Sequence, residues 1–163
     1  MTRAYIGLGA NLGDAARQVE RAIMALGDLG RVRASSLYRS EPLGDADQPW
    51  YVNAVAALDT ELDAHELLAR LHRLERRFGR APGRPRWASR ELDLDLLMYG
   101  DRVCAEADLV LPHPGLAERR FVLEPLAELE PGARDPRTGR SMAELLAGLD
   151  DPLTVEKLPA RSV

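Results

Sequence analysis

Apolar and polar residues repeat with two different periods along the first hundred residues. A period of two, typical of strands with one buried face, marks four stretches: residues 4–8, 32–38, 51–60 and 91–99. A helical period marks two stretches, residues 15–26 and 64–78, each preceded by an aspartate that can cap a helix. The resulting β-α-β-β-α-β order predicts an α+β fold with a ferredoxin-like core, in which helices flank a mainly antiparallel sheet.

The alternation also assigns side chains to the two faces of each strand. In stretch 91–99 one face carries Leu92, Leu94, Leu96 and Met98, and the other carries Asp93, Asp95, Leu97 and Tyr99. In stretch 51–60 one face carries Val52, Ala54, Ala56 and Leu58, and the other carries Tyr51, Asn53 and Val55. The weaker pattern beyond residue 100 predicts strands near Val103, at 109–111 and at 153–158, a helical stretch at 116–120, and a capped helix from Ser141 to Gly148.

Composition narrows the class of protein. A length of 163 residues predicts a single domain, residues 1–163, and 45% hydrophobic with 29% charged residues is typical of a globular protein. The sequence has no apolar run long enough to span a membrane and no secretory signal. The one cysteine, Cys104, fits a reducing cytoplasm. A net charge of −4 argues against a protein whose main task is to coat nucleic acid.

The basic residues restrict how a phosphate group could be bound. Lys157 is the one lysine among 22 lysine and arginine residues, so a phosphate site must use arginine side chains or backbone N–H groups. The sequence contains neither a P-loop motif nor a G-x-G-x-x-G motif followed by an acid that binds ribose. Both common modes of nucleotide binding are therefore disfavoured.

The pair Asp93 and Asp95 is the sharpest chemical feature. Alternate residues of a strand point the same way, so both carboxylates project from one face, roughly 6.6–6.8 Å apart along the backbone. Their mutual repulsion calls for a cation, and Mg²⁺ commonly binds through one or two carboxylates together with substrate phosphates. The alternative is an exposed acidic face that the nearby arginines neutralise. The D-x-D spacing alone does not decide between them.

A basic loop, residues 80–89, leads into this acidic strand. Arg84, Arg86 and Arg90 could bind phosphate oxygens or form salt bridges with the carboxylates. Trp87 is either a buried loop residue or part of a lid over an aromatic ligand. Tyr51 and Asn53 share a strand face that suits a flat heterocycle, although exposed tyrosine and asparagine are common on strands.

The remaining candidates are single residues. Phe121 belongs either to the core or to an aromatic site, and His113, between two prolines, could contact phosphate or cap a helix. His65 and His72 are expected on the exposed side of a helix, where metal binding is not expected. The sequence has no zinc-site spacing and no nucleophile-elbow motif.

Four ordered blocks resemble the 6-hydroxymethyl-7,8-dihydropterin pyrophosphokinase family of folate biosynthesis. The blocks are Ala4–Asp14, Tyr38–Gly44 continuing through Gln48–Asn53, Arg86–Leu97, and Leu111–Pro114 followed by Arg119–Phe121. Together they span most of the first 125 residues. The resemblance implies a ferredoxin-like α+β fold and the transfer of pyrophosphate from ATP to the pterin hydroxymethyl group, with release of AMP.

The resemblance also implies roles for individual residues. Asp93 and Asp95 would hold two Mg²⁺ ions that bridge the ATP phosphates. Pterin binding falls to Tyr51 and Phe121, which would sandwich the ring, to Asn53 and Leu43 at its edge, and to Trp87 in a lid. ATP binding falls to Glu75, Arg80, Arg90, Leu96, His113 and Arg119. Arg90 and Arg84 are expected to act in catalysis, Arg84 because family members often have an arginine where Pro82 stands.

The sequence departs from the family pattern at several further positions, and two rival functions stay open. Ser89 replaces a commoner proline, Pro114 follows the histidine in place of other residues, and Asp108 stands where some relatives have an arginine. The expected partners are the two small-molecule substrates, with no nucleic acid or membrane, and the chain is expected to be a monomer. The rivals are another D-x-D enzyme, a metal-dependent nucleotidyl- or glycosyl-transferase, and a non-catalytic ferredoxin-like binding or regulatory domain.

Overall fold

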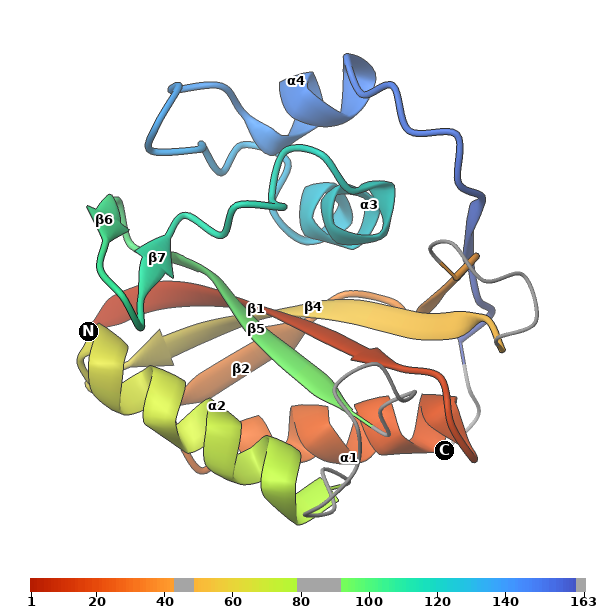
Figure 1. Cartoon of the computed structure of the whole chain (residues 1–163), viewed down its shortest axis with the longest axis horizontal. Coiled ribbons are helices and arrows are strands. Elements are labelled where there is room, and N and C mark those ends of the chain that lie inside the picture. Colours follow the sequence, from red (N-terminus) through yellow and green to blue (C-terminus); the bar gives the residue numbers. More distant parts are fainter. Residues whose placement is uncertain (43–48, 79–91, 161–163) are drawn as a thin grey trace.

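An antiparallel sheet forms the centre of the protein (Figure 1). The computed structural model describes residues 1–42, 49–78 and 92–160, and in this part of the chain the sheet has six strands. These are β1 (Thr2–Ala10), β2 (Arg31–Ala34), β3 (Tyr38–Ser40), β4 (Tyr51–Thr60), β5 (Asp93–Tyr99) and β8 (Val155–Lys157). The short strands β6 (Cys104–Ala105) and β7 (Val110–Leu111) form a separate two-stranded sheet.

The strand order is the one expected for a ferredoxin-like core. The strands follow the order β5-β1-β4-β3-β8, β2 also pairs with β4, and every pair is antiparallel. Strand β1 is therefore central, with β4 on one side and β5 on the other. The predicted α+β class and its antiparallel sheet are confirmed.

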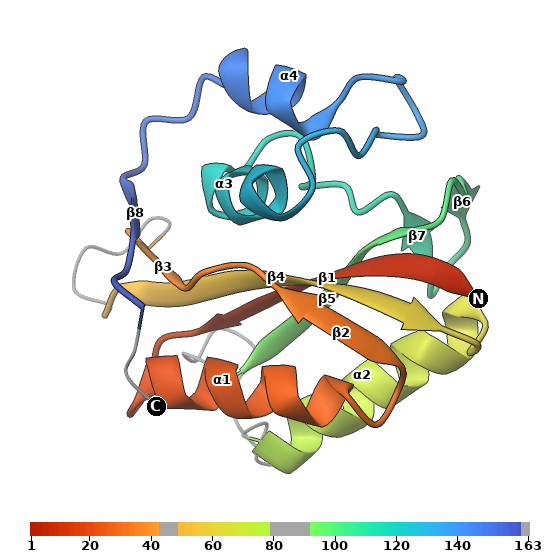
Figure 2. The ribbon, with the colours of Figure 1, turned by 180° about the vertical axis from the view of Figure 1, so that it is seen from behind.

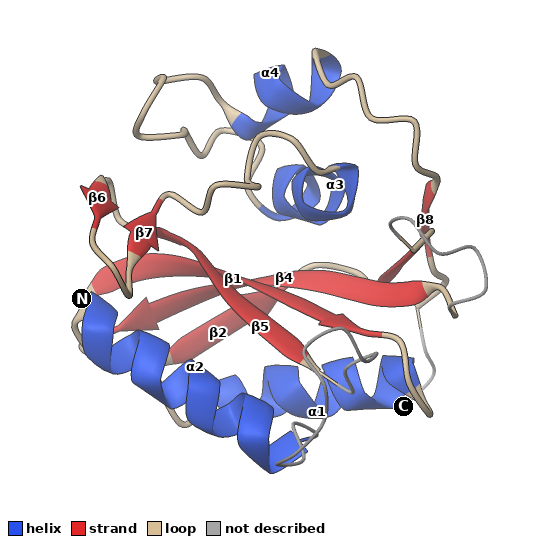
Figure 3. Ribbon diagram, in the orientation of Figure 1, coloured by secondary structure: helices blue, strands red, loops and turns tan. Residues whose placement is uncertain are grey.

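Helices cover both faces of the sheet (Figures 2 and 3). The helices are α1 (Ala15–Leu26), α2 (Ala64–Phe78), α3 (Arg120–Leu129) and α4 (Met142–Ala147). Helices α1 and α2 lie on one face, which we call the α1/α2 face, and α3 lies on the other, the α3 face, with α4 packed outside it. Each face has its own hydrophobic cluster, so the sheet is buried on both sides.

Local capping explains where the helices begin. The Asp14 carboxylate accepts a hydrogen bond from the Arg17 N–H at 3.2 Å, and Asp63 accepts one from the Glu66 N–H at 2.8 Å. Ser141 and Glu144 form the reciprocal capping box predicted for α4. The prediction at 116–120 was wrong, because this segment forms turns and α3 begins only at Arg120. The sequence pattern does not predict α3, because Pro125 lies inside this helix and proline normally interrupts a helix.

A β-bulge changes the phase of β5. Tyr5 pairs with Met98 but Ile6 pairs with Leu96, so Leu97 is an extra residue in the ladder. As predicted, Leu94 and Leu96 pack on the α1/α2 face and Leu97 on the α3 face. The face assignments of Met98 and Tyr99 were wrong, because the extra residue sends Met98 to the α3 face and Tyr99 to the α1/α2 face.

The predicted strand 32–38 is two strands, β2 and β3. Between them the Ser35 hydroxyl accepts the Val55 N–H at 3.0 Å, in place of a regular ladder bond. Three residues of this strand stand opposite two of β4, so its alternation shifts by one position. Val32 therefore packs on the α1/α2 face and the Tyr38 hydroxyl reaches Glu128 of α3, whereas the pattern had placed both side chains on one face.

No helix among the described residues has the length and apolar character needed to cross a membrane.

Candidate active site

A cavity of about 210 Å³ opens on the α3 face of the sheet. This volume corresponds to several water molecules at roughly 30 Å³ each, so it is larger than a packing defect. Side chains and backbone from β1, β3, β4, β5 and the start of α3 line it. The lining includes six residues that the sequence singled out: Tyr51, Asn53, Asp93, Asp95, Arg119 and Phe121.

The carboxylates of Asp93 and Asp95 share one wall of this cavity. The pairing of β5 with β1 places Gly9 opposite Asp93 and Gly7 opposite Asp95. Both glycines also line the cavity, and neither carries a side chain that would cover the carboxylate beside it. The side chain of Asp95 is exposed and that of Asp93 is half-buried. The site can therefore offer carboxylate oxygens, the ligands that Mg²⁺ prefers, to a bound ion.

The Asn53 side chain is held from two sides. The Ser40 hydroxyl donates a hydrogen bond to Asn53 Oδ1 at 2.6 Å, and both residues are buried. A Cβ atom on Gly9 would lie 3.1 Å from Asn53 Nδ2, so glycine at this position gives the amide its room. Ser40 lines the cavity and was missed by sequence reasoning, because a serine in a short strand has no distinguishing signal.

Two aromatic side chains contribute to the lining. Tyr51 lies at the start of β4, and Phe121 lies in the first turn of α3. The Arg119 guanidinium lies over the Phe121 ring, 5.8 Å from its centroid, and it also lines the cavity. A Cβ atom on Gly115 would come within 2.7 Å of Arg119 Nε, so this glycine leaves space for the arginine. The cavity therefore combines ring surfaces, a fixed cation and two carboxylates.

His113 lies near this site without lining the cavity. Its backbone N–H donates to the Leu97 carbonyl of β5 at 2.9 Å, and its imidazole Nδ1 accepts the backbone N–H of Gly115 at 3.0 Å. Burial lowers the pKa of the imidazole, Asp95 opposes this shift and Arg119 adds to it. A neutral ring whose Nδ1 accepts a hydrogen bond carries its proton on Nε2. The geometry thus leaves Nε2–H as a donor, on an imidazole close enough to Asp95 and Arg119 for their charges to shift its pKa.

Two other predicted ATP contacts are not part of the cavity lining. Leu96 is buried on the α1/α2 face, opposite the two carboxylates. Glu75 is buried in α2, and its Oε2 accepts the Leu94 N–H at 2.9 Å. Their roles in ATP binding stay predictions. The other predicted site residues lie outside the described residues; they are Leu43, Arg80, Arg84, Trp87 and Arg90.

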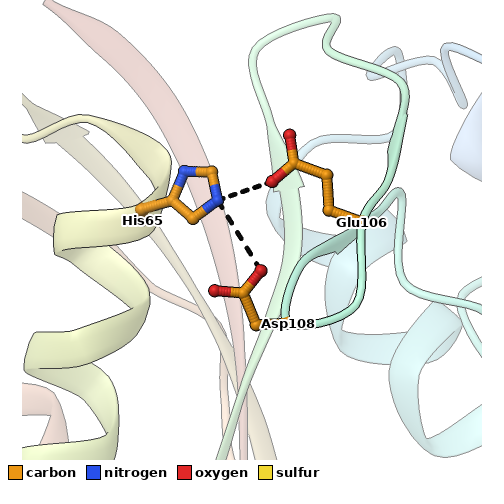
Figure 4. Close-up of side chains that lie close together, drawn as sticks. All are labelled: His65, Glu106 and Asp108. Carbon is orange, nitrogen blue, oxygen red and sulfur yellow. Dashed lines mark hydrogen bonds and ion pairs between the residues drawn. The ribbon is translucent and has the colours of Figure 1, made fainter.

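A separate group of titratable side chains joins α2 to the β6–β7 turn (Figure 4). His65 Nε2 lies 2.8 Å from Glu106 Oε2 and 3.8 Å from Asp108 Oδ1. Among the described residues, this is the one group of three histidine, cysteine, aspartate or glutamate side chains whose potential metal-ligand atoms all lie within 4.8 Å of one another. All three side chains are exposed, and the contacts are those of a surface ion pair. The prediction that His65 binds no metal remains a prediction.

The fold and the cavity define an α+β protein with a cavity on one face of its sheet. A family model for 7,8-dihydro-6-hydroxymethylpterin-pyrophosphokinase (HPPK) matches residues 5–131. The chain belongs to this family.

Proteins named 2-amino-4-hydroxy-6-hydroxymethyldihydropteridine pyrophosphokinase are similar along most of the chain. The protein of Methylorubrum extorquens is 42% identical over 161 residues, which cover 97% of this chain and 99% of that protein. The protein of Pseudomonas aeruginosa is 44% identical, with 96% and 97% covered. The protein of Haemophilus influenzae is 45% identical over 132 residues, with 79% and 82% covered.

Solved structures show the same fold. The wild-type HPPK-DHPS of Plasmodium falciparum, crystallised with pteroate, matches with a TM-score of 0.74 over 90% of this chain. The chain spans 44% of that longer chain, and the sequence identity is 13%. At this identity the likeness supports the α+β fold alone.

Proposed function

We propose that the cavity beside β5 is the active site, and that Asp93 and Asp95 hold two Mg²⁺ ions there. The protein, as a member of its family, is an ATP-using pyrophosphokinase: it transfers pyrophosphate to the hydroxymethyl group of 6-hydroxymethyl-7,8-dihydropterin in folate biosynthesis. The observation that carries the site assignment is that two carboxylates, two residues apart on β5, open into a cavity lined by Tyr51 and Phe121.

The reaction places clear demands on the site. The hydroxymethyl oxygen forms a bond to the β-phosphorus of ATP, the bond from this phosphorus to the oxygen that bridges it to the α-phosphorus breaks, and AMP leaves with that oxygen. The hydroxyl proton is released to a base. Mg²⁺ supplies neutralisation and alignment of the phosphate oxygens. The protein must therefore mainly position two substrates and counter their charge.

The residues around the cavity can meet these demands. The carboxylates of Asp93 and Asp95 are anionic oxygen ligands that line the cavity side by side on β5, which fits Mg²⁺. Arg119 offers a guanidinium, and His113 offers its Nε2–H, to phosphate oxygens on the same side. Tyr51 and Phe121 stack on the pterin ring, while the Asn53 amide, oriented by Ser40, binds its polar edge.

The other predicted contacts belong to the proposal as well. Arg84 and Arg90 counter the charge of the triphosphate, Arg80 binds ATP, and Leu96 borders the adenine. Leu43 and Trp87 contact the pterin. The partners are the two small molecules; the chain works as a monomer of one domain, residues 1–163, in the cytoplasm, without nucleic acid. Sedimentation of the purified protein tests the monomer.

One assay tests the function against its rivals. The protein is incubated with ATP, Mg²⁺ and 6-hydroxymethyl-7,8-dihydropterin, and the nucleotide products are separated. We expect AMP and the pterin diphosphate in equal amounts, both dependent on the pterin. Formation of ADP, or consumption of another nucleotide donor without the pterin, would favour a different D-x-D transferase. The absence of any Mg²⁺-dependent product would favour a binding domain and would refute the proposal.

A further inference from the structure

The buried face of α2 contains one charged residue. Leu67, Leu71 and Glu75 follow one another at intervals of four, so they lie on one stripe of the helix, and all three are buried. Glu75 is 4% exposed. Leucine would continue the apolar stripe without any cost of burying a carboxylate, which is high unless hydrogen bonds satisfy the charge. The position of Glu75 therefore calls for a function that leucine could not perform.

The carboxylate of Glu75 binds the backbone of β5. Its Oε2 accepts the Leu94 N–H at 2.9 Å, in a buried environment. Strand β5 lies at one end of the strand order, so in the described sheet only β1 pairs with it. Backbone N–H groups of successive residues point to opposite sides of a strand. The Leu94 N–H therefore points away from β1, and Glu75 satisfies it from the outer edge of the sheet.

The residue that Glu75 binds stands between the two carboxylates of the cavity. The Leu94 side chain points into the core on the α1/α2 face, while Asp93 and Asp95 open into the cavity on the other face. Because the Leu94 N–H donates to Glu75, the N–H groups of Asp93 and Asp95 point to the opposite side, toward β1, where Gly9 and Gly7 stand opposite them. The backbone between the aspartates is thus held by β1 on one side and by Glu75 on the other.

We propose that Glu75 is a positioning residue, which holds β5 through the Leu94 amide so that the Asp93 and Asp95 carboxylates keep the spacing that binds Mg²⁺ with ATP. The proposal rests on the proposed role of the two aspartates. A contact between Glu75 and ATP, which the family resemblance implies, is a different role. The two roles predict different responses to substitution, because only positioning acts through Leu94.

Two substitutions separate the roles. Glu75→Gln removes the charge but retains a side-chain oxygen that can accept the Leu94 N–H. Glu75→Leu removes the acceptor and continues the apolar stripe, so loss of folding is not expected to obscure the result. Glu66→Gln and Glu66→Leu are matched controls, because Glu66 belongs to the same helix and is exposed.

Each variant is measured in three ways in the full-length protein. Hydrogen exchange of the Leu94 amide, followed by NMR, reports the hydrogen bond without any ligand. Electron paramagnetic resonance of Mn²⁺, with α,β-methylene ATP present, reports metal affinity without turnover. Steady-state kinetics give kcat, the KM for ATP and the Mg²⁺ concentration for half-maximal rate.

We expect Glu75→Leu to accelerate exchange of the Leu94 amide and to weaken Mn²⁺ binding by about 10- to 100-fold, the usual cost of losing a group that orients a metal ligand. The Mg²⁺ requirement should rise and kcat should fall, whereas Glu75→Gln should stay within about threefold of the parent because its acceptor remains. Neither control should change any of these quantities.

Other outcomes overturn the proposal. Unchanged Leu94 exchange and Mn²⁺ affinity in Glu75→Leu would refute it. A raised KM for ATP in both Glu75 variants, with metal affinity unchanged, would assign Glu75 to direct ATP binding instead. Failure of the proposed function is distinguishable, because in that case the parent protein forms no AMP or binds no Mn²⁺ with the nucleotide analogue, whatever Glu75 does to Leu94.

Discussion

The two faces of the sheet are built from the same strands and yet differ in how completely they are filled. On the α1/α2 face, the inward residues of β1, β4 and β5 are small or aliphatic apart from Tyr99, and two long helices cover them. On the α3 face, α3 covers the part of the sheet near Val55, Leu97 and Met98, and the cavity lies beside its first turn.

This difference shows how one strand can serve both stability and chemistry. Leu94 and Leu96 of β5 bury their side chains among the aliphatic residues of the α1/α2 face, while Asp93 and Asp95 open into the cavity. Apart from Glu75, which binds the β5 backbone itself, substitutions on the two faces should therefore change different measured quantities. Those on the α1/α2 face should change the free energy of unfolding, and those in the cavity should change turnover.

The largest effect is expected from the carboxylates. Asp93→Ala or Asp95→Ala should lower kcat by on the order of 10³-fold, or about 4 kcal/mol in activation free energy, because the charge that holds Mg²⁺ is lost. The thermal midpoint should stay close to that of the parent, since neither side chain is buried in a hydrophobic cluster. Parent-like turnover in either variant would exclude that aspartate from the metal site.

The opposite result is expected on the α1/α2 face. Leu71→Ala should lower the free energy of unfolding by about 3 kcal/mol, the cost of a cavity left by a fully buried leucine. Turnover of the folded fraction should change little. Chemical denaturation followed by circular dichroism measures the first quantity, and activity well below the thermal midpoint measures the second. A selective loss of kcat would show that the two faces are not independent.

The two phenylalanines give a smaller and matched test. Phe121→Ala should raise the KM for the pterin about tenfold, because a stacking surface is lost. Phe78, in α2, is partly buried against the α1/α2 cluster and does not line the cavity. Phe78→Ala should lower stability and leave the pterin KM unchanged. If both variants raise this KM equally, the aromatic assignment at Phe121 fails.

The smallest effect is expected at Glu128, which joins α3 to β3 and β8 away from the cavity. Burial raises the pKa of this carboxyl, but hydrogen bonds from Ser36, Lys157 and Tyr38 outweigh it and hold the pKa below its usual value of 4.5. The resulting stability is complete above pH 4.5 and is lost as the pH falls through the lowered pKa.

Glu128→Gln should therefore cost about 1 kcal/mol at neutral pH and less in acid, given the exposure of the group. Urea denaturation at pH 7 and pH 3 measures the difference. An equal loss at both values would contradict the assigned charge interaction.

Periodicity was sufficient to predict the helices and strands that contain no extra or irregular residue. The alternation of β4 predicted both its bounds and its faces, and Asp14 and Ser141 marked the starts of α1 and α4. The errors in the faces of the strands came from single extra residues. Leu97 in β5 and the break at Ser35 each shift the alternation by one position, and pairing with a neighbouring strand, which sequence alone does not show, decides where that happens.

The candidate site was predictable to a similar extent. Residues with distinctive chemistry, such as Asp93, Asp95 and Phe121, were singled out before the structure placed them around one cavity. Ser40, Gly7 and Gly9 were not, because their importance lies in what they touch or leave empty. Serine and glycine have many uses, and only the register of β1 with β4 and β5 shows which use applies here.

The extra residue of β5, Leu97, also determines how the C-terminal end of this strand is anchored. Beyond Leu97 the strand turns Tyr99 toward α2, where its hydroxyl donates to the Leu62 carbonyl at 2.8 Å in the connection that follows β4. Deleting Leu97 would restore regular alternation in β5. The Tyr99 side chain would then point to the α3 face, away from the Leu62 carbonyl. Strand β5 carries Asp93 and Asp95 at one end, and the insertion of Leu97 allows Tyr99 to anchor its other end.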